Sequence, residues 1–589
     1  MSILNYKNAY RTVKFLRANM LLGLSLVAAS LSLVNALSDG RPHANFMRKP
    51  TIPIVPVEHT GPVTSRNGTM LPPYNMTYTF QQLIDHNNPS LGTFTQRYWH
   101  TYEFYEDGGP IILFTPGEAN AQPYTGYLTN VTINGQIAQQ ENGAAIVLEH
   151  RFYGLSNPRP DLSVASLRLH TIQQAIDDLE YFANNVVLPM PNGGKLKPAT
   201  TPWILVGGSY SGALTSWTMV NKPGLFAAGY ASSAVVEAIL DFWQYFEPER
   251  LFMPANCSSD IEAVMSHIDE VFTGSDQHAI QEIKDNFGIG DVTHLDDAAG
   301  SLRNNLWDWQ GLSLSEGPGA QFFNFCDALE VKNGGERACS GMGSGPRALC
   351  MGFILEDNLS RVDLRRRRCR VSQAALNALY SMLTCLRDCL GSYNTSQAFW
   401  TDTSIDNAGR SWFWIVCNEV GFLQESAPIG SPSLVSRIIQ PIYDLRQCQQ
   451  MFAAAFPSPP NVQTAQTNKA YDGWNVSISN LFFANGQRDP WRYSTVSAPG
   501  VTLKSTPQQP IAEGQGYHCA DLLTREGTAN PTVLAVQTEG LASMKRWIAA
   551  WKPAKALTAR QPDIQSQEPG PSAKLTKPLQ GWFRMPVLN

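Results

Sequence analysis

Short apolar runs alternate with amphipathic stretches along the first half of the chain. The runs at 111–114, 144–148 and 204–206 have the length and composition of buried strands. Between the last two runs, a capping box from Thr171 to Gln174 opens a stretch whose apolar residues recur on one helical face. Strands and helices in alternation predict a parallel sheet covered by helices on both faces.

The pattern changes near residue 240. Over 241–454 helical patterns and loops replace the apolar runs, and nine of the ten cysteines lie there, which predicts one large, mostly helical insertion held by disulfides. A strand-like run returns at 481–484, and a strong helical pattern covers about 533–551. The chain therefore divides into an α/β body of two parts, an insertion between them and a mobile tail; the predicted bounds are 76–240 and 455–552 for the body and 553–589 for the tail.

The N-terminal residues predict a targeting segment and a leader. Basic residues precede an uncharged apolar run at 20–34, which ends in the small residues of a cleavage site. Because this run is shorter than the roughly 20 residues of a spanning helix, we expect a signal peptide at 1–36 rather than an uncleaved anchor. Residues 37–75 are Pro-rich and lack periodicity, which indicates a leader or pro-segment. No later run is apolar enough to span a bilayer, so no stable membrane insertion is expected after signal cleavage.

Two further features favour the secretory route. The ten cysteines indicate disulfides formed in an oxidising compartment, with a pairing that the sequence does not decide. The expected location is extracellular, with a vacuole or lysosome as the alternative. Seven Asn-x-Ser/Thr sequons are candidate glycosylation sites, at Asn67, Asn75, Asn130, Asn256, Asn358, Asn394 and Asn475.

Charge and motif content limit the other functional classes. A net charge of −5 argues against nucleic acid as a partner. Neither an HExxH motif nor paired CxxC spacings occur, so neither a metal site nor a cofactor is expected. The Gly/Ser-rich residues 341–345 and the basic run 365–370 fit no predicted element. We interpret them as a solvated loop, or as sequence that a faulty gene model left in the chain, rather than as a processing or anion-binding site.

The residues from Ile204 to Leu214 predict a nucleophile elbow, the sharp turn that lifts a serine above the edge of a sheet. Two glycines precede Ser209, and glycine tolerates the strained backbone of such a turn at the least cost. The usual Gly-x-Ser-x-Gly pattern has glycine where Ser211 stands. The alternative is an ordinary Gly/Ser turn between a strand and a helix.

A serine nucleophile needs a histidine base and a carboxylate that orients the histidine. In this kind of fold the acid and then the histidine follow the serine along the chain. His518 is the one histidine after Ser209 that lies outside the insertion. Asp489 follows the run at 481–484, so its carboxylate is expected at the carboxyl end of a strand. The alternatives are a surface-loop histidine and a turn aspartate before proline.

Further motifs follow one another in a fixed order. They are Phe80-x-Gln82-x-x-Asp85-His86, Phe94-x-Gln96-Arg97-Tyr98-Trp99, Gly109-Pro110 with Gly117-Glu118, Glu149-His150-Arg151-Phe152-Tyr153-Gly154, Gly207-Gly208-Ser209-Tyr210, Asn485-Gly486-x-x-Asp489-Pro490-Trp491 and Tyr517-His518. With them the chain resembles, over about residues 78–552, the prolylcarboxypeptidase-like serine peptidases, a family that includes dipeptidyl peptidases and fungal acid prolyl endopeptidases. The resemblance implies an α/β-hydrolase fold with a large, mostly helical, disulfide-containing cap insertion. It also implies Ser209 as nucleophile, Asp489 as orienting acid and His518 as general base.

The resemblance extends to the surroundings of this triad. The backbone N–H of Tyr210 would supply one oxyanion donor and the loop at Gly117 the second, as in other α/β-hydrolases. Tyr210, Trp491 and Tyr517 match the family's pocket positions, where aromatic faces suit a flat proline ring; each is alternatively a core aromatic. Glu419, in a segment similar to the part of the cap that faces the site, is a candidate for reading a substrate terminus.

The expected activity is hydrolysis of peptide bonds on the carboxyl side of proline, through an acyl-enzyme and, by the resemblance, at acidic pH. Carboxypeptidase, dipeptidyl peptidase and endopeptidase action all stay open. The expected partners are proline-containing peptides or proteins, with a homodimer as a candidate assembly. The alternatives are an esterase or lipase and a catalytically inactive binding protein.

Overall fold

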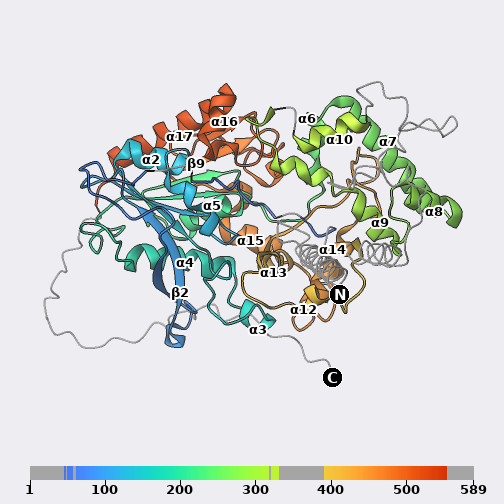
Figure 1. The fold of residues 1–589 in the computed structure, drawn as a ribbon, viewed down its shortest axis with the longest axis horizontal. Helices are drawn as coiled ribbons and strands as arrows, with labels where there is room; N and C mark the ends of the chain where they lie inside the picture. The colour runs from blue at the N-terminus through green and yellow to red at the C-terminus, as the bar shows by residue number, and fades with distance from the viewer. Residues whose placement is uncertain (1–44, 48, 58–60, 318–319, 330–389, 554–589) are drawn as a thin grey trace, which may run out of the picture. The chain divides into compact units, whose positions relative to one another are not determined.

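The computed structural model describes residues 45–47, 49–57, 61–317, 320–329 and 390–553 (Figure 1). They belong to one compact unit, Met1–Pro553. The predicted signal peptide, Asn358, the segments at 341–345 and 365–370, and residues 554–589 of the predicted tail lie outside the described residues. Within the described part of the chain, every helix is too short or too polar to cross a membrane.

A mixed sheet of eight strands forms the centre of the described unit, in the order β1-β2-β4-β3-β5-β6-β9-β10 (Figure 1). The strands from β4 to β10 in this order pair in parallel, whereas β2 is antiparallel to both β1 and β4. Every residue of β3, β4 and β5 is buried, which explains why these strands appear as unbroken apolar runs in the sequence. The predicted strands at 111–114, 144–148, 204–206 and 481–484 are confirmed as β3, β4, β5 and β9, and the sheet is parallel as predicted except at β1 and β2. The bounds are β1 Tyr78–Leu83, β2 Thr93–Thr101, β3 Ile111–Thr115, β4 Ala144–Leu148, β5 Trp203–Gly208, β6 Ala228–Ser232, β9 Leu481–Gly486 and β10 Ile511–Gly514.

Helices cover both faces of the sheet. α2 and α17 pack together over one face, and α4 and α5 over the other (Figure 1). The N-cap half of the predicted capping box is confirmed at the start of α4, since the Thr171 hydroxyl accepts a hydrogen bond from Gln174 N at 3.2 Å. The Gln174 side chain binds Arg151 and His86 N instead. The predicted C-terminal helix is α17. The bounds are α2 Ile133–Glu141, α3 Val164–Leu167, α4 Ile172–Asn185, α5 Tyr210–Asn221, α15 Thr464–Tyr471, α16 Thr524–Ala529 and α17 Pro531–Ala550.

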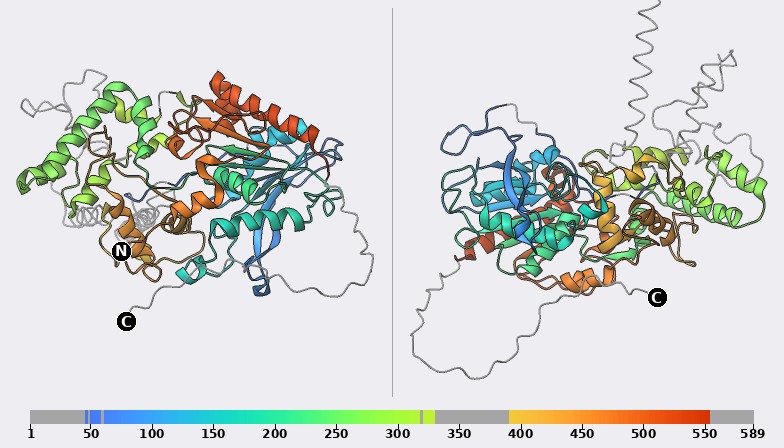
Figure 2. Two further views of the ribbon diagram at one scale, coloured as in Figure 1. Left: turned by 180° about the vertical axis from the view of Figure 1, so that it is seen from behind. Right: turned by 90° about the horizontal axis from the view of Figure 1, so that it is seen from below.

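The insertion lies between β6 and β9, which are neighbours in the sheet, so the sheet continues across it without a break. Figure 2 shows its helices gathered to one side of the sheet. A short parallel pair, β7 (Ile239–Asp241) and β8 (Gly421–Leu423), lies at its base. Its described helices are α6 Glu247–Phe252, α7 Ala255–Phe272, α8 Gln277–Asn286, α9 Leu295–Leu302, α10 Gln321–Leu329, α12 Ala398–Thr401, α13 Ala408–Ile415 and α14 Pro441–Met451.

Two disulfides join helices within the described part of the insertion. Cys257–Cys326 links α7 to α10, and Cys417–Cys448 links the π-helical turn Val416–Val420 to α14. Cys519 lies outside the insertion and is free and buried. The expectation that all ten cysteines form disulfides is therefore wrong for Cys519.

The described part of the predicted leader is packed into the folded unit. Phe46, Met47 and Ile52 are at most 4% exposed. The Phe46 ring lies 4.5 Å from the ring of Phe413 on α13. Because this segment is irregular, its buried residues show no periodicity, and the sequence pattern wrongly favours a place outside the body. Its role as a leader or pro-segment stays a prediction.

Candidate active site

β5 runs directly into the turn at Ser209, and α5 begins at the next residue. Ser209 has a φ of 63° and a ψ of −125°, the strained backbone of a nucleophile elbow. A Cβ atom on Gly207 would lie 2.0 Å from the Ser211 carbonyl oxygen, so this position requires glycine. A Cβ atom on Gly208 would lie 2.7 Å from Leu522 Cδ1, so a larger residue there would displace that side chain. The Ser211 hydroxyl accepts a hydrogen bond from Gly208 N at 3.2 Å, which explains how a serine fits where the usual pattern has glycine.

Three side chains from distant parts of the chain meet at this turn. His518 Nε2 lies 2.6 Å from Ser209 Oγ, and His518 Nδ1 lies 2.8 Å from Asp489 Oδ1. Asp489 follows β9 and His518 follows β10, so all three residues lie at the carboxyl edge of the parallel strands. Trp491 N donates to Asp489 Oδ1 at 2.9 Å and holds the carboxylate in place. In this arrangement His518 can take the Ser209 proton while Asp489 holds its Nδ1–H.

The three side chains are shielded from solvent, with Ser209 and Asp489 0% and His518 3% exposed. Burial by itself lowers the pKa of His518, but the Asp489 carboxylate, with a further contribution from Cys519, outweighs burial and raises that pKa well above its usual value. The imidazole therefore keeps its proton to a higher pH than a free histidine does. It becomes available as a base only as the pH rises.

The loop after β3 lies against the start of α5. A Cβ atom on Gly117, whose φ is +78°, would lie 3.3 Å from Tyr210 Cδ1. The predicted first oxyanion donor, Tyr210 N, belongs to the first residue of α5, where amides have no partner within the helix. The predicted second donor, Gly117 N, donates to Thr115 Oγ1 at 3.3 Å. This bond engages the Gly117 amide, and the role of Gly117 as the second oxyanion donor stays a prediction.

Glu118 is a residue of this loop to which the sequence pattern assigns no role. Its side chain is 0% exposed, and neither carboxyl oxygen has a hydrogen-bond partner among the described residues. Burial raises the pKa of Glu118 to about 8, although the charges of Lys49 and His518 oppose this rise. The Glu118 carboxyl group thus lies within electrostatic reach of the candidate base. Its one signal in the sequence is its place in the Gly117-Glu118 motif.

The predicted pocket aromatics are Tyr210, Trp491 and Tyr517. Each lies within two residues of a triad residue in the sequence, and all three are buried. Each contacts an aromatic ring of the insertion, with ring centroids 5.2 Å apart for Tyr210 and Trp412, 5.4 Å for Trp491 and Phe422, and 5.3 Å for Tyr517 and Trp309. The structure therefore places all three where the body meets the insertion. This position is compatible with a pocket wall and with a core aromatic.

The family model for serine carboxypeptidase S28 matches residues 81–305 and 348–539. This chain belongs to the S28 family. The serine protease vicPb of Bipolaris victoriae is 35% identical over 479 residues, which cover 80% of this chain and 88% of the relative. The probable extracellular serine carboxypeptidase of Arthroderma benhamiae is 30% identical, over 73% of this chain and 60% of the relative. The thymus-specific serine protease of Homo sapiens is 26% identical, over 80% of this chain and 86% of the relative.

Similar solved structures are more distant from this S28 chain. An acetylester hydrolase from Corynebacterium glutamicum has 12% identity and a TM-score of 0.32, over 79% of this chain and 95% of the other. A proline iminopeptidase of Mycobacterium smegmatis has 11% identity and a TM-score of 0.32, over 79% of this chain and 100% of the other. As a member of the S28 family, the chain is a serine peptidase with an α/β-hydrolase fold.

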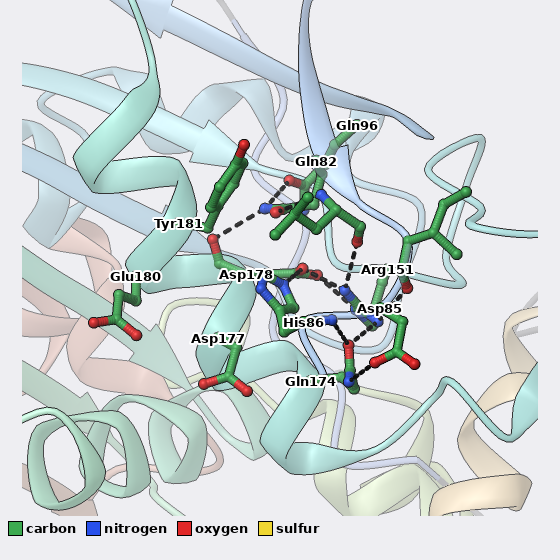
Figure 3. Close-up of polar contacts among 12 residues, drawn as sticks. Gln82, Asp85, His86, Gln96, Arg151, Gln174, Asp177, Asp178, Glu180 and Tyr181 are labelled. Atoms are coloured by element: carbon green, nitrogen blue, oxygen red, sulfur yellow. Dashed lines mark hydrogen bonds and ion pairs between the residues drawn. The ribbon is translucent and has the colours of Figure 1, made fainter. Parts of the chain in front are cut away.

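Motif residues outside the triad form a buried polar network in this S28 peptidase (Figure 3). Arg151 Nε donates to Asp178 Oδ2 at 2.7 Å, and His86 Nε2 lies 2.7 Å from Asp178 Oδ1. Gln174 Oε1 accepts from Arg151 Nη1 at 2.9 Å and from His86 N at 3.1 Å. The network joins the loops after β1 and β4 to α4. It thereby fixes His150, whose Nε2 lies 3.2 Å from the hydroxyl of the tyrosine that follows Ser209.

Glu419 makes a contact with the start of α4 that the sequence does not predict. Its carboxyl oxygens accept from Ile172 N at 3.2 and 3.3 Å, at the N-terminus of α4. Burial raises the pKa of Glu419 to about 7, and this hydrogen bond opposes the rise. The contact joins the insertion to the body. The role of Glu419 in reading a substrate terminus stays a prediction.

The predicted glycosylation sites that fall within the described residues are all exposed, at Asn67, Asn75, Asn130, Asn256, Asn394 and Asn475. An attached glycan requires such exposure. Among the described residues no group of three His, Cys, Asp or Glu side chains is arranged to hold a metal ion.

Proposed function

We propose that this S28 chain is a secreted peptidase that hydrolyses peptide bonds on the carboxyl side of proline. Ser209 is the nucleophile, His518 the general base and Asp489 the orienting acid. The observation that carries the proposal is the chain of hydrogen bonds between them, 2.6 Å from His518 to Ser209 and 2.8 Å from His518 to Asp489. The family's description as serine carboxypeptidases supports the same chemistry.

The reaction begins when Ser209 Oγ attacks the scissile carbonyl carbon and His518 Nε2 takes the hydroxyl proton. The developing charge on the carbonyl oxygen is received by Tyr210 N–H and by a second amide of the loop at Gly117. The His518 imidazolium, stabilised by Asp489, then protonates the leaving amine. The resulting acyl-enzyme is hydrolysed by a water molecule that His518 deprotonates.

The preference for proline is proposed from the aromatic surroundings of the triad. A prolyl ring is apolar and brings no N–H, so aromatic faces can cover it without leaving a polar group unpaired. The Trp491 ring lies 6.4 Å from the His518 ring, and Tyr210 directly follows the nucleophile. A wall made of these rings, with Tyr517 beside them, suits a proline residue just before the scissile bond.

The pH dependence is proposed from the environment of His518. The acidic working pH implied by the resemblance requires an imidazole that stays unprotonated in acid. Asp489 has the opposite effect, because it raises the pKa of His518 well above its usual value. We therefore propose an activity that rises from acidic to neutral pH.

Matched peptide reporters test the proposal. One set carries proline before the scissile bond and the other alanine, each with free or blocked ends, at about pH 4.5 and about pH 7.5. Proline-selective cleavage that Ser209→Ala abolishes is the expected result, and the preferred end identifies carboxypeptidase, dipeptidyl peptidase or endopeptidase action. Cleavage of short acyl esters but of neither peptide set by a folded protein would refute the prolyl proposal.

Secretion and N-glycosylation are proposed from the exposed sequons, and one relative is named an extracellular serine carboxypeptidase. Treatment of the protein from culture medium with an N-glycosidase is expected to lower its apparent mass. A protein that stays in the cell with an unchanged mass would contradict this part.

A further inference from the structure

Residues 45–47 and 49–57, here called the threading segment, run from the insertion to the surface of the body. From Asn45 to Ile52 every described residue is buried or half-buried, and the segment reaches solvent at Ile54, which is 55% exposed. At its start, Asn45 Nδ2 donates to Asp297 O at 2.9 Å in α9. At its end, the Tyr127 hydroxyl donates to the carbonyl of Pro53 at 2.9 Å.

The threading segment passes the candidate acid and base. Lys49 Nζ donates at 3.4 Å to the main-chain carbonyl of Glu118, the buried residue within electrostatic reach of His518. Lys49 O accepts from Gln310 Nε2 at 2.9 Å. The same Gln310 accepts from Trp491 Nε1 at 2.9 Å, two residues beyond Asp489. Lys49 is thus held between the oxyanion loop and the loop of the orienting acid.

The threading segment also reaches the nucleophile turn. Ile52 Cγ2 lies 2.8 Å from the position of a Cβ atom on Gly208, the residue before Ser209. Lys49 therefore lies against the loop at Glu118 and, through Gln310, the loop of Asp489, whereas Ile52 packs against the end of β5. A substrate carbonyl must come within about 3–3.5 Å of the nucleophile, so it needs the space next to these loops.

The contacts along the threading segment are of a kind that binds peptides of many sequences. Side-chain donors hold its main-chain carbonyls at four-residue intervals, Arg303 Nη2 to Asn45 O at 3.2 Å, Gln310 Nε2 to Lys49 O at 2.9 Å and Tyr127 Oη to Pro53 O at 2.9 Å. Main-chain hydrogen bonds of this type give affinity, and side-chain pockets add preference. The Phe46 ring, 4.5 Å from Phe413, fills one such pocket.

We propose that the threading segment occupies the channel through which a peptide substrate reaches Ser209, so that a chain carrying it in place is latent. The proposal rests on the proposed function, since it takes Ser209 as the nucleophile. Once the segment leaves, Arg303, Gln310 and Tyr127 are the residues that position the backbone of an extended peptide substrate. The full burial of Ser209, which is 0% exposed, agrees with a filled channel.

The test opens the full-length chain at a chosen place. A recognition sequence for a site-specific protease is inserted between Gly61 and Pro62, which are both exposed. The rate at which a fluorescent phosphonate labels Ser209 is measured before cleavage, and again after cleavage and gel filtration. We expect at least a tenfold faster labelling of the cut protein, and a synthetic peptide of residues 45–57 is expected to slow it again. Equal labelling rates in the cut and uncut proteins, with release of the segment verified by mass spectrometry, would overturn the proposal.

Two variants of the uncut chain decide the matter if the cut segment stays bound. Phe46→Ala removes the buried ring and is expected to speed labelling severalfold, whereas Ile54→Ala on the exposed part of the segment is the matched control and is expected to leave it unchanged. If Phe46→Ala does not fold, Lys49→Ala replaces it. Equal rates for the buried-site variant and the control would again refute latency.

The phosphonate separates this proposal from the proposed function. It reports an accessible, activated serine whatever the peptide specificity. Faster labelling after cleavage without hydrolysis of proline reporters would sustain latency and refute the prolyl specificity. Absence of labelling in every form, with the protein folded, would refute Ser209 as the nucleophile and the latency proposal with it.

Discussion

Replacement of Asp489 by asparagine keeps the shape of the side chain and removes its charge. Asp489 Oδ1 accepts from both His518 Nδ1 at 2.8 Å and Trp491 N at 2.9 Å. An amide oxygen can still accept these bonds, so the fold is expected to persist. The negative charge beside the imidazolium that forms when His518 takes the Ser209 proton is lost. An Asp-to-Asn change in a comparable triad lowers kcat about 10⁴-fold, which corresponds to about 5 kcal/mol of activation free energy.

The same variant changes the pH dependence in a known direction. Asp489 raises the pKa of His518 against the effect of burial. Without this charge the pKa of His518 falls, and the rising limb of kcat/KM is expected to move to lower pH. Both quantities are measured with a proline reporter on the same preparation, with near-UV circular dichroism to verify folding.

Asp521→Asn is the matched control. Asp521 is a buried aspartate three residues after His518, and it accepts from Tyr230 Oη at 2.9 Å and Ser232 Oγ at 2.7 Å. An asparagine oxygen can keep these contacts, so kcat is expected to stay within about tenfold of the parent. The assignment of Asp489 as the orienting acid is wrong if Asp489→Asn keeps more than a tenth of the parent kcat.

Other predictions follow from the network, a disulfide and the base. Asp178→Asn leaves the buried Arg151 guanidinium without its charged partner and is expected to lower the free energy of unfolding by about 3–5 kcal/mol in a urea titration; a loss below about 1 kcal/mol would contradict the network's role. Replacement of both Cys417 and Cys448 by serine opens a loop with a sequence separation of 31 residues and is expected to cost about 3–4 kcal/mol in the same assay, and an unchanged midpoint would argue against this linkage. For the unaltered enzyme, kcat/KM on a proline reporter is expected to rise from acidic to neutral pH because the pKa of His518 is raised, and a maximum in acid would refute this reasoning.

The central strands can be predicted from the sequence because they are buried on both faces. β3, β4 and β5 are buried at every position and give continuous apolar runs. β1, at the edge of the sheet, has a single fully buried residue, so it gives no such run and the sequence does not reveal it as a strand. The start of the helix at Thr171 is predictable because its N-cap hydrogen bond joins residues three apart.

The same distinction between local and distant contacts applies to the site. Ser209, Asp489 and His518 can be proposed from the sequence because each follows a strand and their chain order is restricted by the fold. The positions of Lys49 and Gln310 cannot be predicted from the sequence, because their contact joins residues 261 apart and leaves no pattern in either segment. The raised pKa of Glu118 cannot be predicted from the sequence either, since it depends on burial of the carboxyl group in the folded protein.

The position of the insertion between β6 and β9 has a consequence for the time course of protein synthesis. The elbow strand and α5 leave the ribosome early, while His518 follows Ser209 by 309 residues. At about 5–20 residues per second, this interval takes about 15 to 60 s. During that time a growing chain carries the proposed nucleophile without its base. The order of translation by itself therefore keeps a nascent chain from cutting its neighbours until its last strands have been made.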